Sequence, residues 1–445
     1  MTDIRLIMPY YRDYQRPQQP LGLYFLKAHL ESKGFTAEVT DYNITGEKLG
    51  NEQYVGITVT TALYPEAVKV IKRAKAKGKT VICGGVHCFS DPDSLLVAGA
   101  DHVVVGDGEY ALEHVLHGYE RGETPDRIIN IQVPDLNELP LPEWVPYGDP
   151  NRAVISTSRG CPWQHGGGCC FCTPHQGKHW RPMSAERVGE WLQRLDGKDV
   201  EVVDDNFTVD KKRVTELERI IRREKLGLSF TFGNGLRIST IDREMLNALK
   251  RLPTEGMAYG VESIHNEVLR ASGKGQTRDL IDSTVRKTRA AGLNFHVFMI
   301  IGLPLETFDK TMQSLDWVKA NKLRAYWNIA TPYPKTALYD WVEGNGRWLI
   351  DPHDYTQYGG HFTKTRIPFD TPDFSGEERE RAFNICQDTM PESNTLRDLA
   401  IRLKGREAKA LLRSIRHNKR LPFRRLLFGV SQTDILEGIR IGDLK

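Results

Sequence analysis

Short β-branched or apolar runs alternate with helix-like segments along most of this 445-residue chain, in two separate series. The first series contains five strand-like runs, at Ile4–Met8, Thr36–Thr40, Tyr54–Val59, Thr80–Ile82 and His102–Val105. Because strands joined by single helices pair in parallel, this series predicts an α/β, doubly wound, Rossmann-like sheet. Ligands bind such sheets at the carboxyl ends of the strands.

The second series contains six strand-like runs separated by helices, from Ala153–Ser156 to Tyr326–Ala330. Eight such units close a complete barrel, so six predict a partial (β/α)6 barrel with its chemistry at the C-terminal strand ends. Five prolines within residues 133–150, between the two series, indicate a linker. We therefore predict a first domain at residues 1–132, a Pro-rich linker at 133–150, the barrel at 151–340 and a mostly helical C-terminal region at 341–445.

Charge and hydropathy exclude several functions. The chain has 61 Lys+Arg against 58 Asp+Glu, a net charge of +3, so its overall charge does not favour nucleic acid. The most apolar stretch, Phe295 to Leu305, is shorter than the ~20 residues of a membrane span. No signal peptide is visible, and a cytoplasmic protein is expected. Ten basic residues between Arg402 and Arg425 form either a solvated helical face or a contact with an acidic partner.

Seven cysteines are present, and four of them fall within twelve residues, from Cys161 to Cys172. A tight cluster in a large chain without secretion signals indicates metal ligation rather than disulfides. Thiolates favour an iron–sulfur cluster, and a cubane held by three cysteines leaves one iron open. Zinc is the alternative, with a fourth ligand from His165, His175 or Cys170.

The position of this loop resembles the radical S-adenosylmethionine (SAM) superfamily, whose usual motif is Cys-x3-Cys-x2-Cys with an aromatic residue before the third cysteine. Cys169, Phe171 and Cys172 fit this motif, but seven residues separate Cys161 from Cys169. The Gly-rich insert at 164–168 is flexible enough to loop out. The resemblance implies Cys161, Cys169 and Cys172 as cluster ligands and Cys170 as a bystander.

Segments at the ends of the next five strands also resemble this superfamily, and they imply a SAM site. Asp204, Asp205 and Glu262 are candidates for the amino and ribose groups, and the backbone around Ile301 and Gly302 for the adenine. Asn234 and Arg237 end the third strand, and Arg237 is expected to meet the methionine carboxylate. A sulfonium zwitterion needs both of its charges countered in a low-dielectric site.

The first domain resembles the cobalamin-binding domain of cobalamin-dependent radical SAM enzymes. The resemblance implies cobalamin contacts from residues at the carboxyl ends of the strands, namely Thr60, Leu63, Tyr64, Gly84, Gly85, His87, Gly106, Gly108 and Glu109. Asn43 stands where one cobalamin class has its cobalt-ligating histidine. Cobalt should therefore have no histidine ligand from the protein, with Leu63 or Tyr64 below the corrin. His87 is either a cofactor contact or a turn-stabilising histidine.

The resemblance implies a C-methyltransferase that acts on an unactivated carbon through a 5′-deoxyadenosyl radical and methylcobalamin, with an external electron donor. The compact chain and the stretched cysteine loop resemble the archaeal glutamine C-methyltransferases of methyl-coenzyme M reductase, which implies a peptide substrate. A small natural product or lipid intermediate, a cobalamin-dependent rearrangement or ring-forming reaction, and tRNA modification are the alternatives. We expect residues after the sixth strand to line the substrate gap or to serve core packing, namely Tyr326, Trp327, Asn328, Tyr333 and Tyr339.

Overall fold

The computed structural model describes residues 2–11, 19–147, 149–173, 177–358 and 366–387. The contacts along the chain group it into two compact units, Met1–Thr389 and Met390–Lys445, and the description below concerns the first. His175 and the basic segment Arg402–Arg425 lie outside the described residues.

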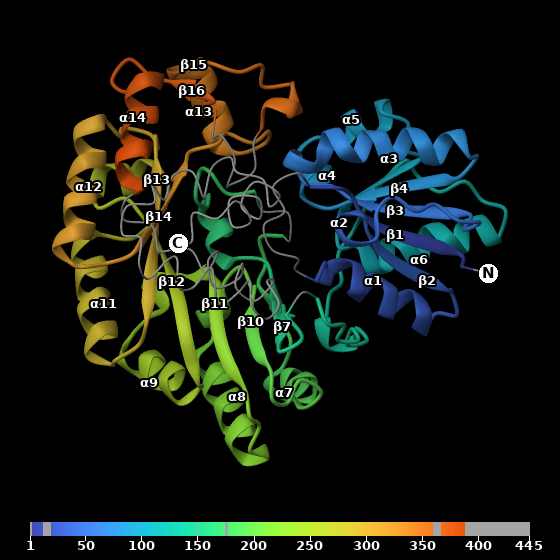
Figure 1. Cartoon of the computed structure of the whole chain (residues 1–445), viewed down its shortest axis with the longest axis horizontal. Coiled ribbons are helices and arrows are strands. Elements are labelled where there is room, and N and C mark those ends of the chain that lie inside the picture. Colours follow the sequence, from blue (N-terminus) through green and yellow to red (C-terminus); the bar gives the residue numbers. More distant parts are fainter. Residues whose placement is uncertain (1, 12–18, 148, 174–176, 359–365, 388–445) are drawn as a thin grey trace, which may run out of the picture. The chain divides into compact units, whose positions relative to one another are not determined.

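The N-terminal sheet has six parallel strands in the order β2-β1-β3-β4-β5-β6 (Figure 1). They are β1 (Ile4–Met8), β2 (Ala37–Asp41), β3 (Tyr54–Thr58), β4 (Thr80–Gly84), β5 (His102–Gly106) and β6 (Ile128–Ile131). The strand order reverses at β1 and β3, which makes the sheet doubly wound as predicted. The sequence prediction omitted β6, because its four residues, two of them exposed, are too few to give a clear strand pattern.

Helices cover both faces of this sheet and bury separate cores. The helices α1 (Leu21–Ser32) and α6 (Gly108–Glu120) pack on one face through buried residues such as Leu30 and Val115. On the other face, α3 (Tyr64–Ala76), α4 (Val86–Ser90) and α5 (Pro92–Val97) bury Ile71, Cys88 and Leu95. The short α2 (Tyr42–Thr45) is capped by the side chain of Asp41. Two apolar faces explain why the strands read as continuous apolar runs.

The Pro-rich segment at 133–150 is irregular, but it is not a loose connection. Val133, Leu136, Leu139 and Leu141 are all buried and belong to the main apolar core of the barrel. Proline prevents regular pairing there, while these apolar side chains still gain free energy from burial. The segment is therefore anchored on the barrel.

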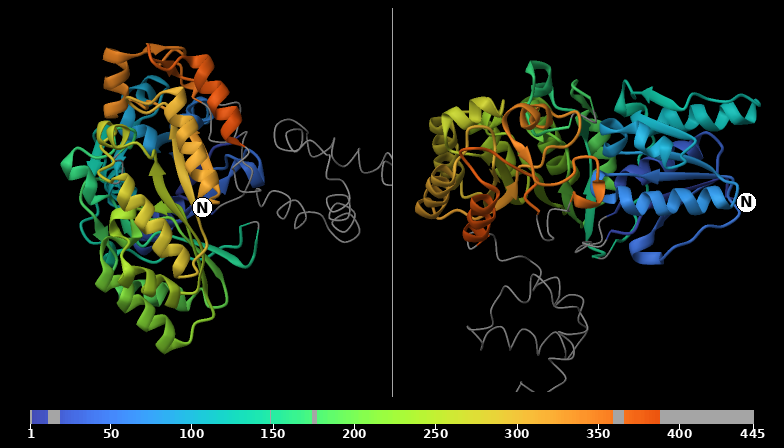
Figure 2. Two further views of the ribbon diagram at one scale, coloured as in Figure 1. Left: turned by 90° about the vertical axis from the view of Figure 1, so that its left-hand side faces the viewer. Right: turned by 90° about the horizontal axis from the view of Figure 1, so that it is seen from above.

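The second sheet is an open, parallel half-barrel in the order β14-β13-β12-β11-β10-β7, which confirms the partial barrel. Its strands are β7 (Arg152–Ile155), β10 (Asp199–Val202), β11 (Ser229–Leu236), β12 (Thr254–Glu262), β13 (Phe295–Ile301) and β14 (Ala325–Ile329). The helices on its outer side are α7 (Ala185–Gln193), α8 (Lys211–Glu224), α9 (Arg243–Arg251), α11 (Arg278–Ala290) and α12 (Phe308–Ala320), as the further views in Figure 2 show. The short α10 (Asn266–Ala271), which the sequence prediction omitted, follows β12.

Alternation along the strands decides which side chains face the helices. In β13, Val297, Met299 and Ile301 are fully buried, whereas Phe298 between them is only half-buried. In β14, Trp327 is 2% exposed and packs in the core with the helix layer, while Tyr326 and Asn328 point to the opposite face. Of the two interpretations offered for Trp327, the structure supports core packing over the substrate gap, because the two-residue period of a strand turns its side chain toward the helices.

The described part of the C-terminal region is less helical than predicted. It contains α13 (Ala337–Asn345), the two-stranded antiparallel pair β15 (Arg347–Trp348) and β16 (Phe369–Asp370), and α14 (Gly376–Cys386). The N-terminus of α14 has a capping box between Ser375 and Glu378. Within the described ranges, none of the helices combines the length and the hydropathy that crossing a bilayer requires.

Candidate active site

The cysteine loop follows β7 and the short strand β8 (Ser158–Arg159), at the C-terminal edge of the half-barrel. Gly160 adopts a φ of +82°, and a Cβ there would stand 2.2 Å from the carbonyl oxygen of His179, so only glycine fits. The thiols of Cys161, Cys169 and Cys172 lie close enough to interact electrostatically. Burial raises the pKa of Cys169, and it raises that of Cys172 to about 12. Three soft sulfur donors on one loop are the ligands that an iron–sulfur cluster takes. Among the described residues, however, no three Cys, His, Asp or Glu side chains are gathered around a single metal position, so the ligand set stays a prediction.

Cys170 differs from its neighbours in its surroundings. Its side chain is 8% exposed and packs among Val268, Leu303 and Leu338. Its backbone N–H donates to the carbonyl of Ser272 at 2.9 Å, and its carbonyl accepts from the N–H of Leu338 at 2.8 Å. This placement suits a core residue that anchors the loop, as the bystander prediction requires.

A buried ion pair stands beside the cysteine loop. The ammonium of Lys274 donates to Oε1 of Glu262 at 2.7 Å, and both side chains are at least nine-tenths buried. Glu262 ends β12 with a φ of +66°, a strained conformation for a non-glycine residue. Burial alone lowers the pKa of Lys274, but Glu262 and Cys169 outweigh it and leave this pKa above its ordinary value. A fixed positive charge therefore stands next to the predicted cluster.

Asp204 and Asp205, which follow β10, have different surroundings. Asp204 is 3% exposed, and its carboxylate accepts hydrogen bonds from the backbone and hydroxyl of Thr157 and from the hydroxyl of Ser158. Burial raises the pKa of Asp204, and Arg213 opposes this. Asp205 is exposed and interacts electrostatically with Cys172. Asp204 thus joins the ends of two strands, and of the pair it is Asp205 that faces the cysteines; both SAM contacts stay predictions.

Asn234 and Arg237 lie at the end of β11. The amide of Asn234 donates to the carbonyls of Val203 and Asp204, both at 3.2 Å, and so bridges the ends of β10 and β11. The guanidinium of Arg237 donates to the carbonyl of Lys274 at 2.5 Å. Arg237 therefore lies beside the Lys274 backbone and close to Cys169. Its positive charge opposes the rise that burial causes in the pKa of Cys169.

The turn after β13 is held by two buried charged residues. Gly302 has a φ of +91°, and its N–H donates to Oε2 of Glu306 at 2.7 Å. Arg379 of α14 is 1% exposed, lies over the rings of Phe369 and Phe374, and donates to the carbonyl of Gly302 at 3.4 Å. The side chain of Ile301 is fully buried, so only backbone atoms of this turn are placed for the predicted adenine contact.

His87 is buried at the turn after β4, with a partner on each ring nitrogen. Nδ1 lies 3.2 Å from Oγ1 of Thr61, and Nε2 lies 3.1 Å from Oγ of Ser94. The ring also packs edge-on against Tyr355. Burial lowers the pKa of His87 to about 4, so it is neutral. These contacts favour the turn-stabilising interpretation over a cofactor contact.

The other predicted cobalamin residues divide by exposure. Thr60 is exposed, Tyr64 is half-buried and Leu63 is 3% exposed. Of the four glycines predicted to contact cobalamin, Gly84 has no protein atom within 4 Å of an added Cβ. At the glycines Gly85, Gly106 and Gly108 an added Cβ would instead stand within 3.0 Å of other protein atoms. Their lack of a side chain is therefore explained by protein packing alone.

Glu109 has a partner that the sequence prediction did not identify. Arg159 of β8 donates to Oε1 of Glu109 at 2.6 Å and to Oε2 at 3.0 Å, and it also donates to Asp107 at 2.9 Å. Arg181, which pairs with Arg159 between β8 and β9 (Arg181–Pro182), bonds Asp107 as well. The arginines hold the pKa of Asp107 below its ordinary value despite burial. A buried charge network thus joins the cobalamin-domain turn to the strand that precedes Cys161.

The predicted substrate-lining residues are not all in one place. Tyr333 stacks on Tyr358, and Tyr339 packs against Trp348, so both tyrosines contact the C-terminal region. Tyr326 instead contacts His296 and Phe298 on the half-barrel face opposite the helices.

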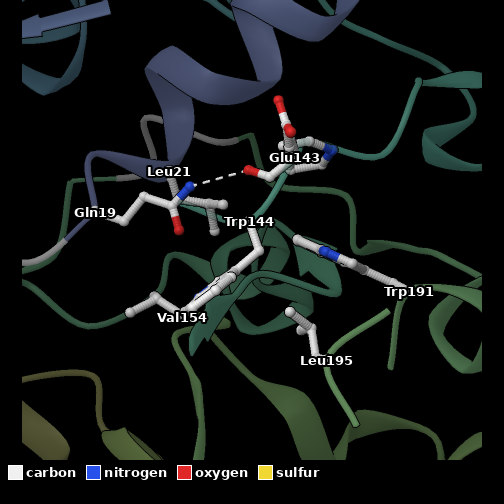
Figure 3. A pocket seen from close by; sticks show the side chains of 8 residues that line it. Gln19, Leu21, Glu143, Trp144, Val154, Trp191 and Leu195 are labelled. Atoms are coloured by element: carbon white, nitrogen blue, oxygen red, sulfur yellow. Dashed lines mark hydrogen bonds between the residues drawn. The ribbon is translucent and has the colours of Figure 1, made fainter. Parts of the chain in front are cut away.

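A small pocket lies elsewhere. It is lined by Gln19, Leu21, Glu143, Trp144, Val154, Trp191 and Leu195, with Gln19 donating to the Glu143 carbonyl at 3.3 Å (Figure 3). None of the predicted site residues lines it.

Three charged residues of the site were missed by the sequence prediction, namely Arg159, Lys274 and Arg379. Each is buried or nearly buried, and each bonds a residue that had been identified. A sequence signal was available for two of them: Arg159 directly precedes Gly160 and Cys161, and Lys274 stands between two glycines. No such signal existed for Arg379, because its partner Gly302 is 77 residues away.

Comparisons with known proteins agree with this arrangement. Residues 155–318 match the radical SAM superfamily, and residues 12–116 match the B12 binding domain. An uncharacterized methyltransferase of Pyrococcus horikoshii is 28% identical over 400 residues, which cover 78% of this chain and 85% of that protein. The bacteriochlorophyllide d C-8(2)-methyltransferase of Chlorobaculum tepidum is 24% identical over 69% of this chain and 72% of its own. The structure of the radical SAM methyltransferase TsrM from Kitasatospora setae shares the fold, with a TM-score of 0.67 at 16% identity over 88% of this chain and 89% of TsrM.

The two matched domains contain the thiol loop and the turns expected to hold cobalamin, in the predicted order. They imply a 4Fe-4S cluster, SAM and cobalamin as cofactors. These two domains, together with the similarity to methyltransferases over most of the chain, support a cobalamin-dependent radical SAM methyltransferase.

Proposed function

We propose that this enzyme methylates a carbon atom that carries no acidic hydrogen. The observation that carries the proposal is the buried network between Arg159 and Glu109. Arg159 stands two residues before Cys161, and Glu109 lies in the first turn of α6, after the predicted cobalamin turn. Both binding elements are therefore held by one set of ion pairs, which a reaction shared between two cofactors requires. The hydrogen-abstracting chemistry that a radical SAM domain supplies suits a carbon without an acidic hydrogen, for which polar transfer has no nucleophile.

When bound, the cofactors supply the electron, the hydrogen-abstracting group and the methyl group, and the chain orients them and excludes water. Glu262 and Lys274 offer opposite charges beside Cys169, and Arg237 adds a second cation. This distribution suits a ligand with separate ammonium and carboxylate groups. The fixed partners of these side chains mean that little reorganisation is needed on binding.

Carbon methylation is favoured over methylthiolation by the cysteines of the first domain. A methylthiotransferase that acts on tRNA needs a second cluster. Cys83 and Cys88 are both fully buried in the apolar core of that domain, and burial raises the pKa of each thiol well above its ordinary range. Neither thiol is placed to hold a cluster, because both side chains are enclosed by apolar residues of that core.

The substrate class has two candidates. The bacteriochlorophyllide methyltransferase among the relatives acts, by its name, on a small ring compound, which supports a small-molecule or lipid substrate. The basic segment Arg402–Arg425 supports a peptide with acidic flanks, and the candidate there is the methyl-coenzyme M reductase peptide that contains the target glutamine. The peptide remains our first candidate, since an extended chain can enter a gap that a folded protein cannot.

The test is anaerobic incubation of the reconstituted enzyme with reductant, cobalamin and SAM, against a peptide panel and a panel of ring and lipid metabolites. Mass spectrometry should find a gain of ~14 Da on carbon, with the methyl group drawn from SAM. A substrate deuterated at the target carbon should transfer deuterium to 5′-deoxyadenosine. Methylation of oxygen or nitrogen without that transfer contradicts the proposal. A metabolite that gains mass while no peptide does excludes the peptide candidate alone.

A further inference from the structure

The expanded cysteine loop is docked against the barrel instead of looping out. Its first residues form a short 3₁₀ turn (Pro162–Gly166), and the indole N–H of Trp163 donates to the carbonyl of Gly273 at 2.8 Å. The backbone of Cys170 bonds the adjacent Ser272. Both ends of the insert are therefore attached to the segment that carries Lys274.

The indole ring of Trp163 also covers a charged side chain of the site. The guanidinium carbon of Arg237 lies 3.8 Å from the centre of the ring, within the distance of a strong cation–π contact. The other contacts of Arg237 are with Oγ of Ser239 at 2.9 Å and the carbonyl of Lys274 at 2.5 Å. Trp163 itself is 37% exposed, so part of its ring is open to solvent while one face covers Arg237.

Two glycines shape the surface on which the insert rests. A Cβ at Gly275 would stand 1.8 Å from Cζ2 of Trp163, and a Cβ at Gly273 would stand 2.1 Å from the carbonyl oxygen of Gly168. The Gly-Lys-Gly sequence thus permits the close approach of the loop, while Lys274 between them pairs with Glu262. These two glycines therefore make room for the residues inserted between Cys161 and Cys169.

We propose that Trp163 is a positioning residue, which holds the guanidinium of Arg237 in place for the methionine carboxylate of SAM. This inference rests on the proposed function, in which SAM binds beside the cysteine loop. Arginine loses rotamer freedom when it binds a carboxylate, and a ring stacked on its plane removes that cost before the ligand arrives. The seven-residue insert supplies the ring.

The test is the affinity of the cluster-loaded enzyme for SAM, measured by anaerobic equilibrium dialysis with labelled SAM and without turnover. Trp163→Leu should weaken binding about tenfold, because the charge-assisted bond is no longer preorganised. Trp163→Phe keeps a ring face and should stay within about threefold of the wild type. Iron content, measured on the same samples, should equal that of the wild type.

A matched glycine pair tests the geometry without touching the ring. Gly275→Ala should displace the indole and weaken SAM binding as Trp163→Leu does, because of the 1.8 Å approach. Gly292→Ala is the control, since its φ of +74° is similarly left-handed but nothing stands within 4 Å of the added Cβ. It should bind SAM as the wild type does.

The double variant Trp163→Leu/Arg237→Met decides whether Trp163 acts through Arg237. Its affinity should equal that of Arg237→Met alone, because the two residues form one unit. Additive losses overturn the inference, as does wild-type affinity in either Trp163→Leu or Arg237→Met. A wild-type enzyme that binds no SAM at all would instead refute the proposed function.

Discussion

Glu306 gives the sharpest prediction, because its burial should make the turn after β13 sensitive to pH. Its carboxylate accepts the N–H groups of Gly302 and Leu303, at 2.7 and 3.2 Å. The residue is 3% exposed, and burial raises its pKa from 4.5 to about 7, although both bonds and Arg379 oppose this. The perturbation is Glu306→Gln, which keeps an acceptor oxygen for both N–H groups and removes the titration.

The sign follows from linkage between protonation and opening of the turn. Opening returns Glu306 to water, so the closed form holds its proton to a higher pH than the open form does. The extra stability of the closed turn is present in full below pH ~4.5 and is lost as the pH rises through ~7. With those two pKa values, closure weakens by about 2.5 kcal/mol between pH 5 and pH 8, or roughly 70-fold.

Hydrogen exchange of peptides covering 300–306 measures this in the intact enzyme, with the turn amides reporting each opening. We expect the ratio of protection between wild type and Glu306→Gln to fall roughly 70-fold from pH 5 to pH 8. Asp309→Asn, an exposed carboxylate on the first turn of α12, should leave the wild-type profile unchanged. A protection ratio that is the same at both pH values would refute the reasoning, since burial would then not govern this carboxyl.

Three further predictions follow from the site. Replacing the three expected cluster ligands together by alanine should remove about four irons per chain in an iron and sulfide assay, while Cys170→Ala retains most of them. The ligands replaced are Cys161, Cys169 and Cys172. Cob(II)alamin in the enzyme should show no nitrogen splitting from a protein ligand in electron paramagnetic resonance, and a nitrogen triplet would contradict this. His87→Gln should leave that spectrum unchanged, because both ring nitrogens of His87 already have partners in the protein. Arg159→Met should destabilise the protein by about 3–5 kcal/mol in denaturant unfolding, because it leaves buried carboxylates unpaired, whereas the exposed Arg219→Met should change it by less than ~0.5 kcal/mol.

The sequence alone determined the architecture and the thiol loop. Both depend on local patterns: β-branched runs alternating with helices predict parallel sheets, and four cysteines within twelve residues indicate a metal centre. The strand β1 was predicted at its observed bounds, and β13 begins where the most apolar stretch of the chain begins, at Phe295, because apolar runs bounded by turn residues carry their own signal. Among the described strands, the prediction omitted β6, β8, β9, β15 and β16, since two to four residues give too little pattern.

The sequence did not determine which face of a strand a residue occupies. Trp327 stands among polar and aromatic residues at the end of the barrel, so its sequence neighbours suggested a substrate contact. The sheet instead turns it toward the helices, where a large apolar side chain gains the most from burial. When one face of a strand is buried and the other is partly covered, composition does not show which set of alternate residues faces the helices.

Tertiary structure alone decided the charge pairing of the site. Arg159 and Glu109 are 50 residues apart in the sequence, and Arg379 and the Gly302 carbonyl to which it donates are 77 residues apart. Each pair is buried, so its strength depends on a low dielectric and on fixed geometry that only the packed fold supplies. For the same reason Glu109 and Asp204, both expected to contact cofactors, were found with protein partners. A motif specifies which groups are present, and the fold decides which of them are already engaged.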